Sequence, residues 1–236
     1  MKIFLLLIFF QSFVYSQTFE ATYQFEINKE YYKNYIQKSV SEGKNPALLK
    51  KAFSRYLNSR PAKAKLIFNS EMSYYYVVQD MNVDQNNRKA DPALIFAGNN
   101  TKIYNTQDQD SIVTHINSEH LDINEFLVKE DTKPVTLKNE TQTIGQYQCY
   151  LAETQYSKKQ SLKLWYAPDI PTNFNIKDYK SLPGLLIKIE SQLFKANLVS
   201  LKQVDATELK QPPSDIRLIT KKEYQDMIDK TNPFKD

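Results

Sequence analysis

The feature that most constrains this fold is a period-of-two alternation of apolar and polar side chains, which recurs along the 236-residue chain. It is clearest in residues 18–28, where Phe19, Ala21, Tyr23, Phe25 and Ile27 alternate with Glu, Thr and Gln. Such a period places successive side chains on opposite faces of a β-strand. By the same criteria, further strands are predicted at 64–68, 73–79, 93–97, 102–105, 111–116, 125–129, 135–143, 147–154, 162–167, 185–191 and 196–203.

Short polar clusters separate most of these predicted strands. Asn and Asp are frequent in residues 84–87, 98–100 and 105–108, and their side chains favour turns because they bond to their own backbone. Strands joined by short turns pair antiparallel, since a parallel pair needs a long crossover. We therefore predict a mainly β protein with helices (α+β), built on a large curved antiparallel sheet or half-barrel.

Residues 29–60 show helical spacing instead. Gly43 is suited to ending a first helix, and Asn45-Pro46 to beginning a second, with Asn45 as the N-cap. We expect an inserted helical hairpin near residues 29–60. Its apolar stripes, with residues four apart, are formed by Tyr32, Ile36, Leu49, Phe53 and Leu57.

A second helical signal lies near the end of the chain. Thr220 and Glu223 have the spacing of a capping box, in which each side chain bonds to the backbone N–H of the other residue. A short C-terminal helix is therefore predicted from Lys221 to about Lys230.

The first 16 residues have the parts of a secretory signal peptide in order. Lys2 precedes an unbroken apolar run, and Val14 and Ser16 are small enough for the −3 and −1 positions of a cleavage site. We expect cleavage before Gln17, export to the periplasm or the cell surface, and a single domain over residues 17–236. The apolar run is too short to span a bilayer and no later segment is longer, so no membrane span is expected.

Residues with the chemistry of catalysis or metal binding are few. The single cysteine, Cys149, lies in a predicted strand and is interpreted as a small buried apolar side chain. His115 and His120 would point to opposite faces of a strand, so they are not expected to bind one metal. The acidic pair Asp108 and Asp110 is interpreted as solvated loop charge. Because no nucleophile elbow, zinc-protease helix or phosphate loop occurs, no catalytic, cofactor-binding or metal-binding residue is predicted.

Positive charge is concentrated in the predicted helical hairpin. Residues 29–65 hold ten Lys and Arg against two Glu, a net charge of +8, whereas the whole chain is at +4. A basic helical face of this kind fits a peripheral contact with an anionic surface, such as a membrane, lipopolysaccharide or acidic glycan. The alternative is an ordinary solvated helix face, and nucleic acid is a poor partner for an exported protein of modest net charge. The candidate contacts are Lys50, Lys51, Arg55 and Arg60.

Tyrosine is abundant, and three tyrosines in a row, Tyr74, Tyr75 and Tyr76, would lie on both faces of one strand. Exposed tyrosines suit a lined groove or a platform for sugars. The alternative is core and edge packing, for which strands select aromatic residues in any case.

The stretch SLPGLL at residues 181–186 predicts a turn followed by a buried strand. Pro183 presets φ for the second position of a turn, and Gly184 accepts the positive φ of the third position in a type II turn. Leu185 should then be buried at the start of a strand.

Three segments together resemble the GLPGLI family of exported proteins of gram-negative bacteria. Residues 181–186 resemble the Gly-Leu-Pro-Gly-Leu-Ile motif, with serine in place of the first glycine. Residues 143–152 resemble the family's IGGYxCxKA stretch and residues 164–171 its AWYTPEIP stretch, while residues 135–137 stand where the family often has a tryptophan. The family has no agreed activity, so the resemblance implies an exported β-rich domain. The residues that carry it are Ser181, Leu182, Pro183, Gly184, Leu185 and Leu186, together with Gly145, Tyr147, Cys149, Trp165, Tyr166, Pro168 and Pro171.

These observations lead us to expect an exported, non-enzymatic envelope protein without a cofactor. It would bind an apolar ligand, a glycan or a partner protein at a curved β-sheet. The alternatives are a hydrolase acting on envelope polymers and an accessory module of an outer-membrane receptor. A carrier would show a continuous apolar groove, whereas an enzyme would show converging carboxylates in a cleft.

Overall fold

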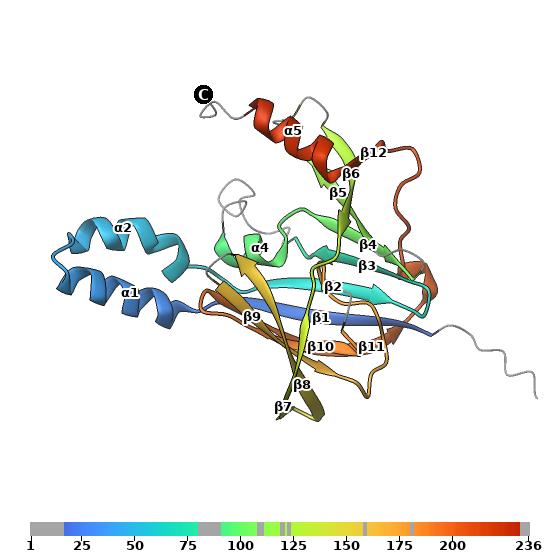
Figure 1. Cartoon of the computed structure of the whole chain (residues 1–236), viewed down its shortest axis with the longest axis horizontal. Helices are drawn as coiled ribbons and strands as arrows, with labels where there is room; N and C mark the ends of the chain where they lie inside the picture. The colour runs from blue at the N-terminus through green and yellow to red at the C-terminus, as the bar shows by residue number, and fades with distance from the viewer. Residues whose placement is uncertain are drawn as a thin grey trace, which may run out of the picture.

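The computed structural model describes residues 17–79, 91–107, 111–118, 121, 124–157, 160–179 and 182–231. Over these residues the chain is mainly β, with one 12-stranded sheet and four α-helices (Figure 1). The strand order is β12-β6-β5-β4-β3-β2-β1-β11-β10-β9-β8-β7, so β12 and β7 are the two edges of an open sheet.

The strands are β1 (Thr18–Ile27), β2 (Ala62–Phe68), β3 (Met72–Val77), β4 (Lys102–Thr106), β5 (Ser111–Asn117), β6 (Glu125–Asp131), β7 (Thr136–Ile144), β8 (Tyr147–Ser157), β9 (Gln160–Ala167), β10 (Leu185–Glu190), β11 (Phe194–Val204) and β12 (Leu218–Thr220). The α-helices are α1 (Lys29–Ser41), α2 (Pro46–Leu57), α4 (Pro92–Ala97) and α5 (Lys221–Thr231), and a short 3-10 helix spans Ala206–Glu208.

The sheet is antiparallel except at one edge. There, β12 pairs parallel with β6, placing Leu218 opposite Leu127. The sequence analysis predicted antiparallel pairing throughout and no strand at residues 218–220, so the sheet is mixed. A strand of three residues is too short to show the alternation from which strands are predicted.

The strand predicted at residues 93–97 is wrong, because this segment is helix α4. Asp91 is its N-cap and accepts a hydrogen bond from the N–H of Ala93 at 3.0 Å, and Pro92 occupies the first helical position. Gly98 ends the helix in a left-handed conformation with φ of 118°. A short apolar run fits a strand and a buried helix equally well, and the flanking Asp-Pro pair and Gly decide between them.

Helix α4 and residues 168–179 and 182–184 pack on one face of the sheet, here called the core face. Alternate residues of β1, such as Tyr23 and Phe25, are fully buried on this face. They share one hydrophobic core with Phe96 of α4 and Phe174 of the segment 168–179. The ring of Phe96 stacks on Phe194 of β11 with centroids 4.4 Å apart. Described segments outside the sheet therefore pack on its apolar face.

Helices α1 and α2 extend away from the sheet as a projection, here called the helical arm (residues 29–57; Figure 1). The two helices pack through aromatic rings, with Tyr32 stacked on Tyr56 at 4.5 Å and Tyr35 in edge contact with Phe53 at 5.3 Å. Asn45 caps α2 by accepting hydrogen bonds from the N–H groups of its first turn. No residue of α2 is fully buried, and its partly buried Phe53, Tyr56 and Leu57 pack against a core cluster that includes Tyr32 of α1.

Helix α5 begins with the capping box that the sequence indicates. Glu223 accepts from the N–H of Thr220 at 2.7 Å, and the Thr220 hydroxyl accepts from the N–H of Glu223 at 3.2 Å. Tyr224 of the helix packs on a small separate core that includes Phe126 of β6 and Ile219 of β12. In the part of the chain that the structure describes, none of the helices has the length and apolar character to cross a membrane.

Candidate functional site

The Pro-Gly stretch before β10 forms a turn, though not the predicted one. Gly184 has φ of +146° and Leu185 is fully buried, as expected. The N–H of Gly184, however, donates to the carbonyl of Leu182 at 2.9 Å, which closes a three-residue turn around Pro183. The N–H of Leu185 donates to the carbonyl of Ile170 at 3.1 Å and not to that of Leu182. The prediction of a type II turn is therefore wrong. Ser181 lies outside the described residues.

Asn175 fixes the strand that follows this turn. Its amide nitrogen donates to the carbonyl of Gly184 at 3.1 Å, and its amide oxygen accepts from the N–H of Leu186 at 2.6 Å. The side chain is buried, so it substitutes for a neighbouring strand at the point where β10 begins. The residues of this stretch are therefore structural. Asn175 was not predicted, because nothing in its local sequence pattern distinguishes it from a loop asparagine.

The other family-like residues are dispersed over β8, β9 and the turns beside them. Gly145 occupies the β7–β8 turn with φ of +61°. Cys149 is buried, and this burial raises the pKa of its thiol. Trp165 is also buried, and its ring N–H donates to Glu190 at 2.9 Å. Of the remaining four, Tyr166 is buried, Tyr147 is half-buried, and Pro168 and Pro171 are exposed.

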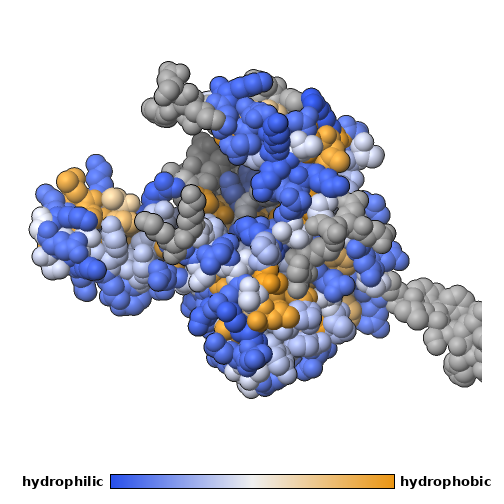
Figure 2. All heavy atoms as spheres, viewed as in Figure 1, coloured by the Kyte–Doolittle hydropathy of each residue, from blue (hydrophilic) through white to orange (hydrophobic). Residues whose placement is uncertain are grey.

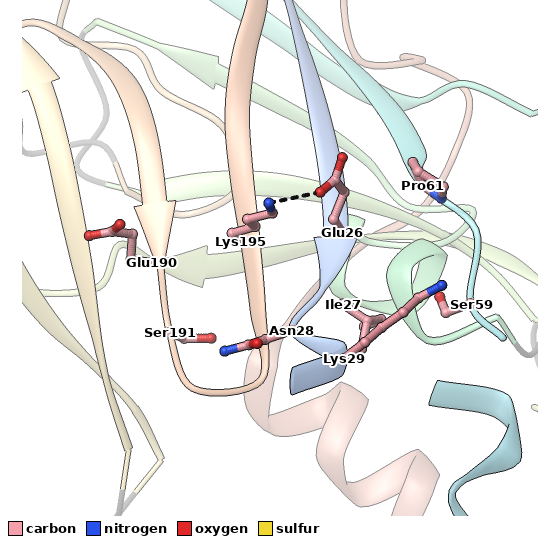
Figure 3. A pocket seen from close by; sticks show the side chains of 9 residues that line it. All are labelled: Glu26, Ile27, Asn28, Lys29, Ser59, Pro61, Glu190, Ser191 and Lys195. Carbon is pink, nitrogen blue, oxygen red and sulfur yellow. Dashed lines mark ion pairs between the residues drawn. The ribbon is translucent and has the colours of Figure 1, made fainter. Parts of the chain in front are cut away.

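A surface pocket of about 530 Å³ lies where the helical arm joins the sheet (Figure 3). We call it the root pocket. The junction of β1 and α1, the segment between α2 and β2, and the β10–β11 hairpin contribute its walls. The lining residues are Glu26, Ile27, Asn28, Lys29, Ser59, Pro61, Glu190, Ser191 and Lys195.

Charged side chains alternate in sign across the sheet beside this pocket, on the face opposite the core. Lys195 of β11 pairs in register with Glu190 of β10 on one side and with Glu26 of β1 on the other. Figure 3 shows Lys195 between these two carboxylates, with its ammonium 3.0 Å from Glu26. Opposite charges facing across strands contribute about 0.2–1 kcal/mol a pair and favour this register. The row continues through β9 and β8 to β7 and consists of Glu26, Lys195, Glu190, Lys163, Glu153 and Lys138.

Both carboxylates of the root pocket are held in their ionised form. A hydrogen bond from Gln24 and the contact with Lys195 lower the pKa of Glu26. Partial burial raises the pKa of Glu190, but bonds from Lys188 and Trp165 outweigh this effect and leave it below the usual value. A general acid must be protonated at the working pH, so neither carboxylate is suited to that role near neutrality.

The uncharged polar side chains of the pocket are held by hydrogen bonds within the protein. The hydroxyl of Ser191 accepts from the N–H groups of Leu193 at 3.1 Å and Phe194 at 3.0 Å. Asn28 caps α1, and Ser59 donates to Asp91 at 2.6 Å. These bonds hold the polar groups of the pocket in place.

The predicted anionic-surface contacts do not form one cluster. Lys50, Lys51 and Arg55 are exposed on α2, whereas Arg60 lies in the segment before β2, where its backbone N–H donates to Asp91 at 3.2 Å.

The three consecutive tyrosines pack rather than form a platform. Tyr75 faces the core and donates its hydroxyl to the carbonyl of Ala97. On the opposite face Tyr74 is buried and stacks on Tyr76 at 5.0 Å and on Tyr104 at 5.1 Å.

Of the two histidines and the acidic pair considered in the sequence, only His115 lies within the described residues. His115 is buried and lies 2.8 Å from Glu125, while His120, Asp108 and Asp110 fall outside the described residues. Among the residues that are described, no three potential metal-binding side chains lie together.

No family model matches this sequence, and no curated protein matches it. Solved structures do match. PNGF-II in a C2 crystal form gives a TM-score of 0.58 at 14% identity, over 92% of this chain and 33% of that chain. PNGF-II in a P21 crystal form gives a TM-score of 0.56 at 17% identity, over 92% of this chain and 34% of that chain. An uncharacterised conserved protein from Thermus thermophilus gives a TM-score of 0.38 at 8% identity, over 88% of this chain and 92% of that chain.

The likeness to PNGF-II shows a shared fold. At 14% and 17% identity it does not extend to activity. The chain spans about a third of the length of the PNGF-II chains that it matches, at 33% and 34%. The class defined by fold and geometry is thus an open, mainly antiparallel β-sheet domain with a projecting pair of helices.

Proposed function

We propose that this protein is an exported, non-enzymatic envelope protein of the GLPGLI type. Its sheet acts as a half-barrel scaffold, and its root pocket binds a polar ligand with the hydroxyl chemistry of a glycan. The observation that carries this proposal is the composition of the root pocket, in which charged side chains alternate and are neutralised by one another.

A polar ligand is favoured over an apolar one. Helix α4 and residues 168–179 and 182–184 already pack on the apolar face of the sheet. In the root pocket, an apolar ligand would remove Glu26 and Lys195 from water without replacing their hydrogen bonds, which is costly.

A neutral ligand is favoured over a charged one. The ammonium of Lys195 already contacts Glu26, and Glu190 already contacts Lys188 and Trp165. Sugar hydroxyls both donate and accept hydrogen bonds, so they can share the carboxylates and ammonium groups without displacing these partners.

Binding is favoured over hydrolysis. Two-carboxylate glycoside hydrolysis needs one protonated carboxylic acid, and the pKa values of Glu26 and Glu190 are both lowered. The two residues also belong to strands separated by β11, whose Lys195 lies between them.

The proposal can be tested on an array of envelope polysaccharides, peptidoglycan fragments and N-glycans. We expect the wild type to bind one class of glycan, and a Glu26→Gln/Lys195→Met variant to lose at least about ten-fold in affinity for it, since each lost hydrogen bond to a charged group is worth about 1.5–3 kcal/mol. The matched control is Lys138→Met/Glu153→Gln, which removes an ion pair at the far end of the same charge row and should bind as the wild type does.

Two results would contradict the proposal. One is an equal loss of binding in both variants, and the other is no binding to any glycan by the wild type. Mass spectrometry of the incubated glycans is a separate readout, because release of a product would support the hydrolase alternative.

Export is tested by sequencing the N-terminus of the protein recovered from the cell envelope. We expect the mature chain to begin at Gln17. An intact Met1 in envelope protein would overturn the proposed cleavage.

A further inference from the structure

The helical arm exposes apolar side chains that its own packing does not use. Leu48 at the start of α2 is 66% exposed, and on α1 Tyr35 is 41% and Val40 38% exposed. Val40 and Leu48 flank the turn that joins the helices, so two of the three lie near the tip of the arm. Figure 2 shows hydrophobic atoms on the arm along α2 and at its tip, bordered by hydrophilic ones. Exposed apolar side chains that gather in a patch rimmed by polar residues are typical of a contact surface.

Basic residues surround this apolar tip. The arm holds seven Lys and Arg against two Glu, a net charge of +5. One of the two acidic residues, Glu42, lies 4.0 Å from Lys44. Lys38 on α1 and Lys50 and Lys51 on α2 are exposed and lie within two turns of the tip.

We propose that the tip of the helical arm inserts Leu48 and Val40 into the interface of an anionic lipid bilayer while the surrounding lysines contact the lipid head groups. Insertion removes exposed apolar surface from water, and each lysine retains its charge at the head-group level. The arm projects from the sheet, so the tip reaches a flat surface before the sheet does (Figure 1). This inference does not depend on the ligand of the root pocket.

The geometry favours a bilayer over a folded protein partner. A stable protein interface needs about 800 Å² from each side with a packed apolar centre. The arm tip projects from the sheet, and in the sequence Lys44 lies between its exposed apolar residues Val40 and Leu48. A fluid surface of negative charge accommodates this arrangement, whereas a protein would need a groove shaped to it.

The experiment is co-sedimentation of the full chain with vesicles of phosphatidylglycerol and phosphatidylcholine across a salt series. The wild type should bind at low salt, weaken as the Debye length falls to roughly 8–10 Å near physiological salt, and not bind phosphatidylcholine alone. One basic contact changes the partition coefficient about five-fold, so Lys50→Gln/Lys51→Gln should reduce binding roughly 10–25-fold at low salt. Leu48→Ser keeps the charge, and should reduce binding about ten-fold at every salt concentration.

The matched control is Lys210→Gln/Lys222→Gln, which removes the same charge from exposed positions remote from the arm. It should bind as the wild type does. A Leu48→Trp variant measures insertion directly, since the fluorescence of the new indole should shift to the blue with anionic vesicles and be quenched by brominated lipid. The proposal is overturned if the wild type fails to sediment, if the control loses as much as the arm variant, or if the fluorescence of the Leu48→Trp variant is unchanged by vesicles.

Discussion

Replacing Gly184 with alanine should destabilise the protein by about 2–6 kcal/mol, the sum of two separate costs. The residue has φ of +146°, a conformation that costs a residue with a side chain about 1–3 kcal/mol. The added Cβ would also lie 2.3 Å from the carbonyl oxygen of Ala167 and 2.8 Å from the Cα of Pro168. Both contacts are with backbone at the end of β9, which cannot rotate away, and overpacking of this kind costs about a further 1–3 kcal/mol.

The matched control is Gly145→Ala. Gly145 also has a positive φ, of +61°, but an added Cβ would meet nothing within 4 Å. This substitution should therefore cost only the backbone term, about 1–2 kcal/mol.

Thermal unfolding monitored by circular dichroism measures the difference between the two variants. For a chain of this size, each 1 kcal/mol corresponds to about 2–4 °C in Tm. We expect Gly184→Ala to melt well below Gly145→Ala, or to fail to fold. Equal Tm values would refute the reasoning, because the contact with the β9 backbone would then contribute nothing.

Three further predictions follow from the same structure. Asn175→Ala should destabilise the fold by about 1–3 kcal/mol in urea unfolding, since it leaves two buried backbone groups unpaired, and a stability equal to wild type would contradict its role as the fixing residue of β10. Burial raises the pKa of Glu20, but the hydrogen bonds and charges of Lys65 and Lys202 outweigh this effect and leave the pKa below its usual value. The stability that ionised Glu20 contributes is therefore present above about pH 4.3, the pKa in the unfolded chain, and is lost as pH falls through the lowered pKa of the folded state. Glu20→Gln should thus reduce Tm near neutral pH and flatten its decline in acid, and an unchanged Tm-pH curve would exclude this linkage. Burial raises the pKa of the Cys149 thiol, so Ellman's reagent should label it slowly in the native protein and fast in denaturant, and fast native labelling would contradict its placement.

The strands of this protein were largely predictable from sequence because their signal is local. In β1, each residue's face follows from its neighbours, and the alternation of Phe25 with Glu26 is the alternation of core and outer face. Helix caps are local too. Asn45 and Thr220 each bond to backbone N–H groups two or three residues ahead, so the residue types alone indicate where α2 and α5 begin.

The segment at 92–97 shows where local signals compete. Its apolar run satisfies a strand and a buried helix equally, and the deciding residues are Asp91 and Gly98 on either side of it. The positive φ of Gly184 was likewise predicted from the Pro-Gly pair. The turn type was not, because the N–H of Leu185 bonds to Ile170, which the chain brings beside it only in the folded state.

The root pocket was beyond prediction, since its walls come from three parts of the chain. Glu26, Ser59 and Glu190 are far apart in sequence, and each has an unremarkable local context. Their meeting depends on the order in which strands join the sheet, which places β11 between β1 and β10. The sequence by itself determined which residues face the core and where most helices begin, because these follow from neighbours within a few residues. Only the tertiary structure decided which distant side chains share a pocket and which apolar residues of the arm stay exposed. Both depend on pairing between distant parts of the chain, which local periodicity does not predict.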